Sequence, residues 1–277
     1  MRRSITAFLL ALLCACFGAG PATLTAAATG VPAVEAALPH KAVYRLSLGE
    51  MRSSSLVVEA TGRFEFEWSD VCDGWAVNQR FRIAFLYEDG LTVSYGWSLS
   101  SWEAKDGKRY RFFIRRFDAS GESESVRGVA ELGADGSGRA TYSEPEARVI
   151  DLPAGTLFPT SHTAHVLEHA SAGSAPVWTL VFDGSGDEGL MGVSTALSPQ
   201  LPPGSPTQFV SPLLRDQASW QVSMAFYQPG AANAEPEQEQ ILRLFANGVV
   251  DEMRLDYSDF VLNADLTDLT ELPQPDC

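Results

Sequence analysis

The chain has 277 residues, with 20 lysines and arginines against 35 aspartates and glutamates, so its formal net charge at pH 7 is -15. The N-terminal segment described next contains two of the arginines and no acidic residue, so its removal leaves 18 minus 35, or -17. Nucleic acid is therefore not an expected partner, because phosphates bind cationic surfaces. The remaining length suffices for one large β domain or two small ones, and the pattern below favours one.

The N-terminus has the composition of a signal peptide. Two arginines precede an apolar run from Ile5 to Phe17, and small residues follow through Ala28. That run is too short to cross a bilayer, which takes about 20 residues. We predict a signal peptide over residues 1–28, export to the periplasm and no transmembrane segment. A loose likeness to a lipoprotein cleavage site leaves a lipid anchor at Cys16 as the less favoured alternative.

Export would leave Cys72 and Cys277 as the cysteines of the mature chain. Thiols pair in an oxidising compartment, so we predict a disulfide between them. Two free buried thiols, or a bond to another chain, are the alternatives.

Apolar and polar residues alternate along much of the chain, as they do in strands with one wet face. From residue 56 to residue 68 one face would carry Leu56, Val58, Ala60, Phe64, Phe66 and Trp68, with a bend expected at Gly62. The alternation repeats from Trp75 to Tyr87 and from Leu91 to Trp102. Glycines that suit tight hairpin turns punctuate these runs, at Asp89-Gly90, Asp106-Gly107, Ser120-Gly121, Asp135-Gly136 and Asn247-Gly248.

These patterns predict an all-β protein. Residues 38–277 should form a single large antiparallel β-spiral or open barrel of about a dozen strands, because an amphipathic sheet without covering helices hides its apolar face by rolling up. One short helix is expected from Phe158 to Gly173, with Thr160 or Ser161 as its cap and Gly173 as its stop. The proline-rich stretches 198–212 and 229–238 should be loops.

The expected helix carries the strongest metal-like pattern, since His162, His165 and His169 would share one face. No cysteine or carboxylate signature reinforces them, and a packed or surface helix explains the spacing as well. No nucleophile motif is present. We therefore expect a non-catalytic protein without a cofactor or metal, and a metal-dependent enzyme using the three histidines is a remote alternative.

Large aromatic side chains suggest a binding cavity. A rolled sheet of this size can enclose an apolar space for a lipid or acyl chain, with Phe64, Phe66, Trp68 and Trp75 facing the ligand, although a fully packed core would also use them. A basic cluster is the other notable surface feature. It could meet an anionic lipid head group or an acidic partner, or it could be an ordinary solvated face, and it comprises Lys105, Lys108, Arg109, Arg111, Arg115 and Arg116.

Several short motifs together resemble one family. They are Pro39–Tyr44, Cys72-Asp73-Gly74-Trp75, Asp89-Gly90, Leu157–His162, Phe182-Asp183-Gly184 and the final cysteine. In this order the chain resembles the cell-envelope integrity protein EipB family, from roughly Leu38 to Cys277.

The resemblance implies a periplasmic alphaproteobacterial protein whose β-spiral looks like the lipoprotein carriers LolA and LolB. It also implies a disulfide between Cys72 and Cys277, a role in envelope integrity, a functional link to a periplasmic tetratricopeptide-repeat protein and no catalytic residues. The first hypothesis is therefore a scaffold that binds a lipid-like chain, lipoprotein or peptide. The second is an interaction protein that docks the repeat protein through its outer surface.

Overall fold

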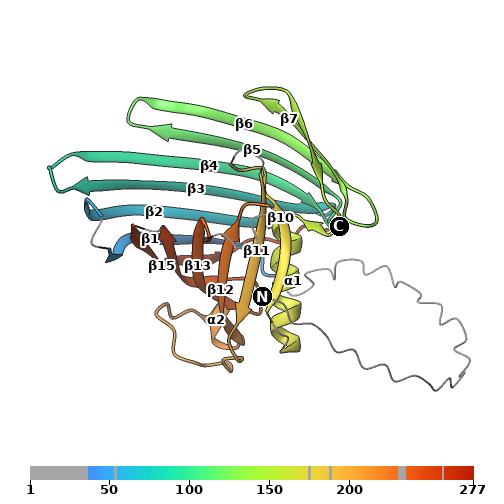
Figure 1. Ribbon diagram of the computed structural model, residues 1–277. Coiled ribbons are helices and arrows are strands. Elements are labelled where there is room, and N and C mark those ends of the chain that lie inside the picture. Colours follow the sequence, from blue (N-terminus) through green and yellow to red (C-terminus); the bar gives the residue numbers. More distant parts are fainter. Residues whose placement is uncertain (1–36, 53–54, 174–175, 187–188, 230–234, 258) are drawn as a thin grey trace, which may run out of the picture.

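The computed structural model describes residues 37–52, 55–173, 176–186, 189–229, 235–257 and 259–277 (Figure 1). The signal peptide and the possible anchor at Cys16, both predicted from the sequence, lie outside these residues. No helix in the described ranges is long and apolar enough to cross a membrane.

The described residues form fifteen strands and two helices, rather than about a dozen strands and one helix. The helices are α1 (Pro159–Ala172) and α2 (Pro212–Arg215). The strands are β1 (His40–Met51), β2 (Val57–Asp70), β3 (Gly74–Tyr87), β4 (Thr92–Ala104), β5 (Arg109–Asp118), β6 (Gly121–Leu132), β7 (Gly138–Glu144), β8 (Arg148–Leu152), β9 (Thr156–Leu157), β10 (Val177–Phe182), β11 (Leu190–Leu197), β12 (Ser219–Tyr227), β13 (Gln238–Phe245), β14 (Val250–Tyr257) and β15 (Phe260–Glu271).

All fifteen strands belong to one sheet, in the order β8-β7-β6-β5-β4-β3-β2-β1-β15-β14-β13-β12-β11-β10-β9. Neighbours are antiparallel except β9 and β10, which are parallel. Two meanders, β1 to β8 and β9 to β15, are therefore joined where β1 pairs with β15. The turn glycines predicted from the sequence do adopt positive φ, as at Gly90 (83°) and Gly248 (83°). The all-β spiral or open barrel is confirmed.

The alternation predicted for the start of β2 is wrong by one residue. Val57 is buried, whereas Leu56 and Val58 are 63% and 43% exposed. A register shift between Val57 and Glu59 against β3 is the cause, because a bulge moves every residue before it to the opposite face. From Ala60 onward the predicted inner face is the observed one.

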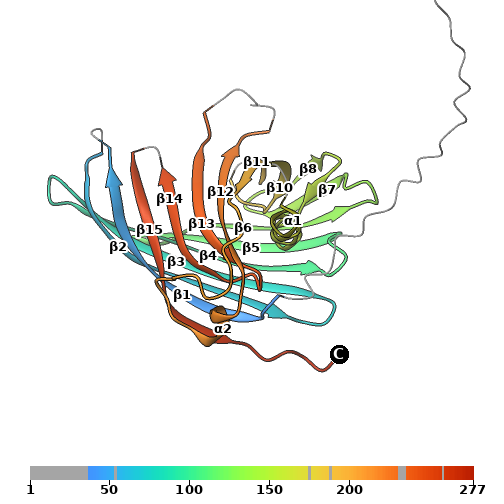
Figure 2. The same cartoon turned by 90° about the horizontal axis from the view of Figure 1, so that it is seen from below.

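The sheet rolls up until its two ends meet (Figure 2). A buried apolar cluster, rich in aromatic rings, joins strands β5 and β7 to β10, with the Tyr110 and Phe158 ring centroids 5.2 Å apart and those of Phe112 and Phe182 5.7 Å apart. Side chains, rather than a further ladder of hydrogen bonds, therefore hold this seam together.

Helix α1 lies within the curve of the sheet (Figure 2), where Val166 and Ala170 pack against Trp220, Val222 and Leu244. Gly173 ends the helix in the left-handed conformation, as predicted. The predicted cap is wrong, since Thr160 and Ser161 lie in the first turn and the cap residue is Phe158.

The carboxylate of Glu103, at the end of β4, takes over the capping role. It accepts the backbone N–H groups of Thr160 (2.7 Å) and Ser161 (2.8 Å) and the Ser161 hydroxyl. Glu103, which is distant in the sequence, therefore caps α1 in place of a Ser or Thr hydroxyl at the start of the helix.

The loop before β12 covers part of the outer surface. It contains α2, which was not predicted, and Leu214 of α2 packs against Phe245 and Val249. Thr207 of this loop hydrogen-bonds to Asp251. The proline-rich stretch 198–212, together with α2, therefore packs over the outer face of β13 and β14.

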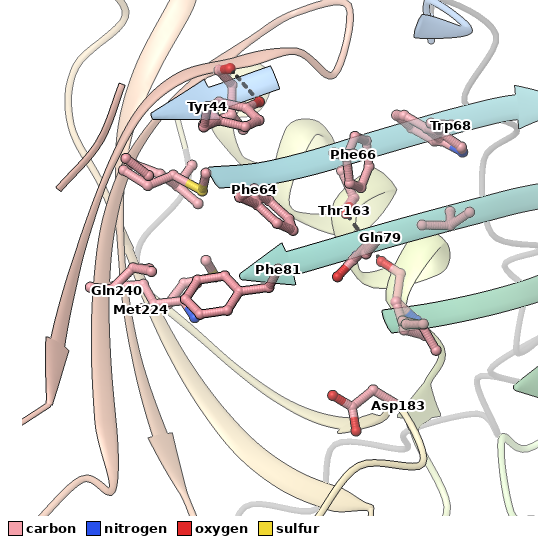
Figure 3. A pocket seen from close by; sticks show the side chains of 18 of the residues that line it. Tyr44, Phe64, Phe66, Trp68, Gln79, Phe81, Thr163, Asp183, Met224 and Gln240 are labelled. Atoms are coloured by element: carbon pink, nitrogen blue, oxygen red, sulfur yellow. Dashed lines mark hydrogen bonds between the residues drawn. The ribbon is translucent and has the colours of Figure 1, made fainter. Parts of the chain in front are cut away.

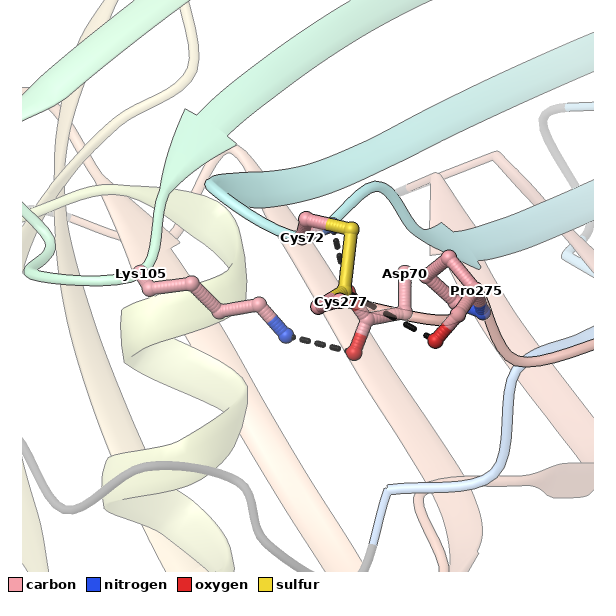
Figure 4. The surroundings of a disulfide bond; sticks show 5 residues. All are labelled: Asp70, Cys72, Lys105, Pro275 and Cys277. Carbon is pink, nitrogen blue, oxygen red and sulfur yellow. Dashed lines mark hydrogen bonds and ion pairs between the residues drawn. A yellow bond between two sulfur atoms is a disulfide. The ribbon is translucent and has the colours of Figure 1, made fainter.

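A disulfide joins Cys72 to Cys277 across 205 residues, as predicted (Figure 4). Cys72 occupies the β2–β3 turn with φ 66°, and its N–H donates to the side chain of Asp70 (2.9 Å). The other Asp70 oxygen accepts Lys105 Nζ at 2.7 Å. The bond fastens the C-terminal residue to the turn that begins β3.

Candidate functional site

A cavity of about 570 Å³ lies inside the rolled sheet. It extends between the first turns of α1 and the end of β14 near Tyr257, and most of its lining is apolar (Figure 3). The apolar lining includes Leu46, Phe64, Phe66, Trp68, Val77, Phe81, Trp97, Leu99, Ile114, Val166, Val222, Met224, Leu242, Leu244, Met253 and Leu255. This volume lies in the range of known sites for small molecules and lipids, about 300–1,000 Å³.

Three of the four side chains predicted to face a ligand line this cavity. Phe64, Phe66 and Trp68 point inward from successive inner positions of β2 (Figure 3). Trp75 does not line it, and instead packs against Trp68 with ring centroids 5.1 Å apart. Lys105 Nζ covers the Trp75 ring at 3.4 Å from its centroid. Trp75 occupies this position because β3 begins beyond the end of the cavity, next to the disulfide.

Aromatic rings from four strands meet around Phe64. Its ring centroid lies 5.5 Å from that of Tyr44, 6.3 Å from Phe81 and 6.1 Å from Trp97, and Phe81 stacks on Trp97 at 5.7 Å. The Tyr44 hydroxyl donates to the carbonyl oxygen of Val250 (2.7 Å), so this buried polar group is satisfied. The middle of the cavity is therefore walled by aromatic rings that contact one another.

Polar side chains from several elements interrupt the apolar lining. Arg116 points inward from β5 and pairs with Glu124, so its charge is balanced. Burial raises the pKa of the Asp183 carboxyl, which accepts the N–H (2.7 Å) and hydroxyl (2.9 Å) of Ser185. Burial, with a smaller effect of the His165 charge, lowers the pKa of His162 to about 4, so this imidazole is neutral at pH 7.

The three histidines do not share one site. His162 lines the cavity, while the rings of His165 and His169 lie on a more exposed part of α1, with centroids 4.3 Å apart and planes tilted by 55°. Among the residues that the structure describes, no group of three or more His, Cys, Asp or Glu side chains is placed to hold a metal ion.

The residues of the family motifs lie in turns at strand ends, with Asp73 and Gly74 at the start of β3 and Asp183 and Gly184 just after β10. Gly74 lies so close to Trp102 that a Cβ atom would overlap the indole, and the carbonyl of Asp73 accepts the N–H of Lys105 (3.1 Å). Gly184 has φ 78° and faces the Phe112 ring in the same way. The carbonyl of Asp183 accepts the Tyr110 hydroxyl (3.3 Å). Of these residues, only Asp183 lines the cavity.

Sequence reasoning missed much of the cavity wall. Arg116 was assigned to a surface cluster, although residues with even numbers in β5, such as Tyr110 and Ile114, point inward. This alternation along β5 would have predicted that Arg116 faces the cavity. The wall from β13 and β14, including Gln240 and Leu255, was missed because these strands have weaker alternation.

Comparisons with known proteins agree with this architecture. The family model described as EipB-like matches residues 32–273. The cell envelope integrity protein EipB of Brucella abortus (strain 2308) is 29% identical over 255 residues, which cover 91% of this chain and 89% of that protein. The crystal structure of a β-barrel-like protein of a domain of unknown function (DUF1849), also from Brucella abortus, superposes with a TM-score of 0.77. It has 27% sequence identity, and the match covers 86% of this chain and 99% of that one. The similarity supports a role in the cell envelope, and this chain belongs to the EipB-like family.

Proposed function

We propose that the mature protein is a non-catalytic periplasmic protein that supports envelope integrity by holding the apolar chain of a lipid or lipid-modified protein in its cavity. The observation that carries the proposal is the cavity of about 570 Å³ with its aromatic wall. The name of the Brucella abortus relative refers to envelope integrity and to no reaction.

The energetics favour an apolar occupant. Each methylene moved from water into such a space contributes roughly 0.8 kcal/mol, so a chain of about ten buried carbons would gain about 8 kcal/mol before the ordering cost. The inward rings of Phe64, Phe81 and Trp97 already contact one another and present apolar surface along the path. An extended acyl chain could lie along them without leaving a buried polar group unpaired.

The polar side chains of the cavity suit a polar but uncharged group. Arg116 is balanced by Glu124, and His162 is neutral at pH 7. Hydrogen-bonding side chains such as Gln79 and Gln240 also line the cavity. An ester or hydroxyl group of a lipid could hydrogen-bond to these side chains. A charged group would have no unpaired counter-ion in the cavity.

The test is a titration of the delipidated mature protein with the methyl ester of a fluorescent fatty acid, which carries no charge. Gln79→Trp should fill part of the cavity and weaken binding at least tenfold. Asn78→Trp is the matched control, because Asn78 precedes it on β3 and is exposed on the outer face. Loss of binding only in Gln79→Trp supports the proposal. Absence of ester binding by the folded wild-type protein rejects it and favours docking of a periplasmic tetratricopeptide-repeat protein or a peptide.

A further inference from the structure

A basic face covers the outer side of strands β3 to β6, which lie side by side along one wall of the barrel (Figure 1). The register places inward Tyr110, Phe112 and Ile114 between outward arginines on β5. Six exposed arginines define this face, with half-buried aromatic rings between them: Arg80, Arg82, Arg109, Arg111, Arg115 and Arg127, with Trp102 and Phe113.

Within the described residues, most of these charges form no close ion pair, although Glu65 and Glu131 lie opposite Arg80 and Arg109 in the strand register. Arg115 approaches Glu122 at 3.9 Å and Arg127 approaches Glu144 at 3.0 Å. In the described part of the chain, the other four arginines form no ion pair with a carboxylate. Arginines that are already paired would gain little from an external anion, so the unpaired four are the ones available to a ligand.

Aromatic rings contact four of the six guanidinium groups on this face, those on β5 and β6. Arg111 lies over the Trp102 ring at 5.0 Å from its centroid, and Arg109 lies over the same ring at 5.6 Å. Arg127 lies 3.9 Å from the Phe113 centroid. Such contacts restrain the side chains but leave their N–H groups free for oxygen anions, which a guanidinium binds in pairs.

We propose that the basic face docks the protein on a membrane surface that contains anionic phospholipid. The whole chain has a formal net charge of -15, so without this face it would be repelled by such a surface. Arginines 109 to 115 extend for roughly 20 Å along β5, and β3 to β6 span about 14 Å across, at the usual strand spacings. An array of this size can contact several phosphates at once.

The rings fit the same partner. Tryptophan and other large aromatic residues are enriched at the boundary between lipid and water, because one part of the ring system is apolar and its edge is polar. Trp102, Phe113 and the 46% exposed Val129 are surrounded by the arginines. The proposal goes beyond cavity binding, since it concerns the outer side of the sheet and holds whatever occupies the cavity.

The experiment is cosedimentation of the mature protein with vesicles of phosphatidylcholine, with and without phosphatidylglycerol. We expect binding only to the anionic vesicles, and release at high ionic strength. The test variant changes the four unpaired arginines to glutamine: Arg80→Gln, Arg82→Gln, Arg109→Gln and Arg111→Gln. At about fivefold per arginine, its affinity should fall by roughly several hundredfold.

A control variant with the same change in net charge separates this face from overall electrostatics. It carries Lys41→Gln, Arg45→Gln, Arg139→Gln and Arg215→Gln, all outside β3 to β6. It should retain binding within a few fold. A variant with the four test arginines changed to lysine keeps the charge and should bind more tightly than the glutamine variant. Equal loss in both glutamine variants, or no binding of the wild type to anionic vesicles, would overturn the proposal. Gln79→Trp should bind vesicles normally, so this result is independent of the cavity test.

Discussion

Replacing Glu103 by alanine should lower the free energy of unfolding by about 3 kcal/mol. The side chain is almost fully buried, and its two oxygens accept the N–H groups of Thr160 and Ser161 and the Ser161 hydroxyl. Each buried donor left without a partner costs about 1–3 kcal/mol, so the two N–H groups alone account for about 2–6 kcal/mol. Removing a buried carboxylate also removes its desolvation cost, which offsets part of this loss.

Thermal unfolding followed by circular dichroism measures the effect. A change of 1 kcal/mol shifts the Tm of a domain of this size by roughly 2–4 °C, so Glu103→Ala should melt roughly 6–12 °C lower. Ser161→Ala removes one of the hydrogen bonds and should cost about 1 kcal/mol. Glu131→Ala, at an exposed position of β6, should change stability by less than about 0.5 kcal/mol. A Glu103→Ala protein that melts with the wild type would refute the capping account of α1.

The pH dependence of the same site gives an independent check. Burial is the main cause that raises the pKa of Glu103 above its usual value of 4.5. The folded protein therefore holds this proton more tightly than the unfolded chain does. The resulting stability is present below about pH 4.5 and is lost as the pH rises through the folded-state pKa. The free energy of unfolding of the wild type minus that of Glu103→Gln should fall from pH 4 to pH 8, and a rise would contradict the assignment.

Three further predictions concern other parts of the molecule. Cys72→Ser and Cys277→Ser should lower the free energy of unfolding equally, by roughly 5 kcal/mol in the chain-entropy model for this separation of 205 residues. Urea unfolding with and without reductant checks this, and unequal losses would count against it. Gly74→Ala should cost about 1–3 kcal/mol because its Cβ would overlap the Trp102 indole, while Gly133→Ala, which has only ordinary contacts, should be nearly neutral in the same melts. His162→Leu should reduce the loss of stability between pH 6.5 and pH 4, because the buried imidazole, with a pKa of about 4, takes up a proton only on unfolding in that range. Urea titrations at both ends of the range should show a smaller difference for the variant than for the wild type.

The features predicted correctly are those encoded by neighbouring residues. Alternation from Phe64 to Trp68 placed three cavity side chains on the inner face, and Gly90 and Gly248 marked turns because they adopt positive φ. The disulfide between Cys72 and Cys277 was inferred from the predicted export and from the cysteines that it would leave. Each of these inferences needs only a local pattern or a count.

The features that were missed depend on contacts between distant residues. The bulge after Val57 shifts the face of Leu56 and Val58, and it arises from pairing with β3. The capping of α1 by Glu103 joins residues 57 and 58 positions apart. The residues that pair β1 with β15, where the two meanders join, are even further apart in the sequence. Local alternation contains no information on these contacts, so the shape of the cavity could not be predicted.

The most direct test of the central claim, that the cavity holds an apolar chain, is native mass spectrometry of the protein purified from its own cells without detergent. The account predicts an added mass, of a lipid or an acyl chain, that disappears on denaturation, is retained by Asn78→Trp and is lost in Gln79→Trp. A folded wild-type protein that gives only the mass of its own chain, from cells with a complete envelope, would contradict it.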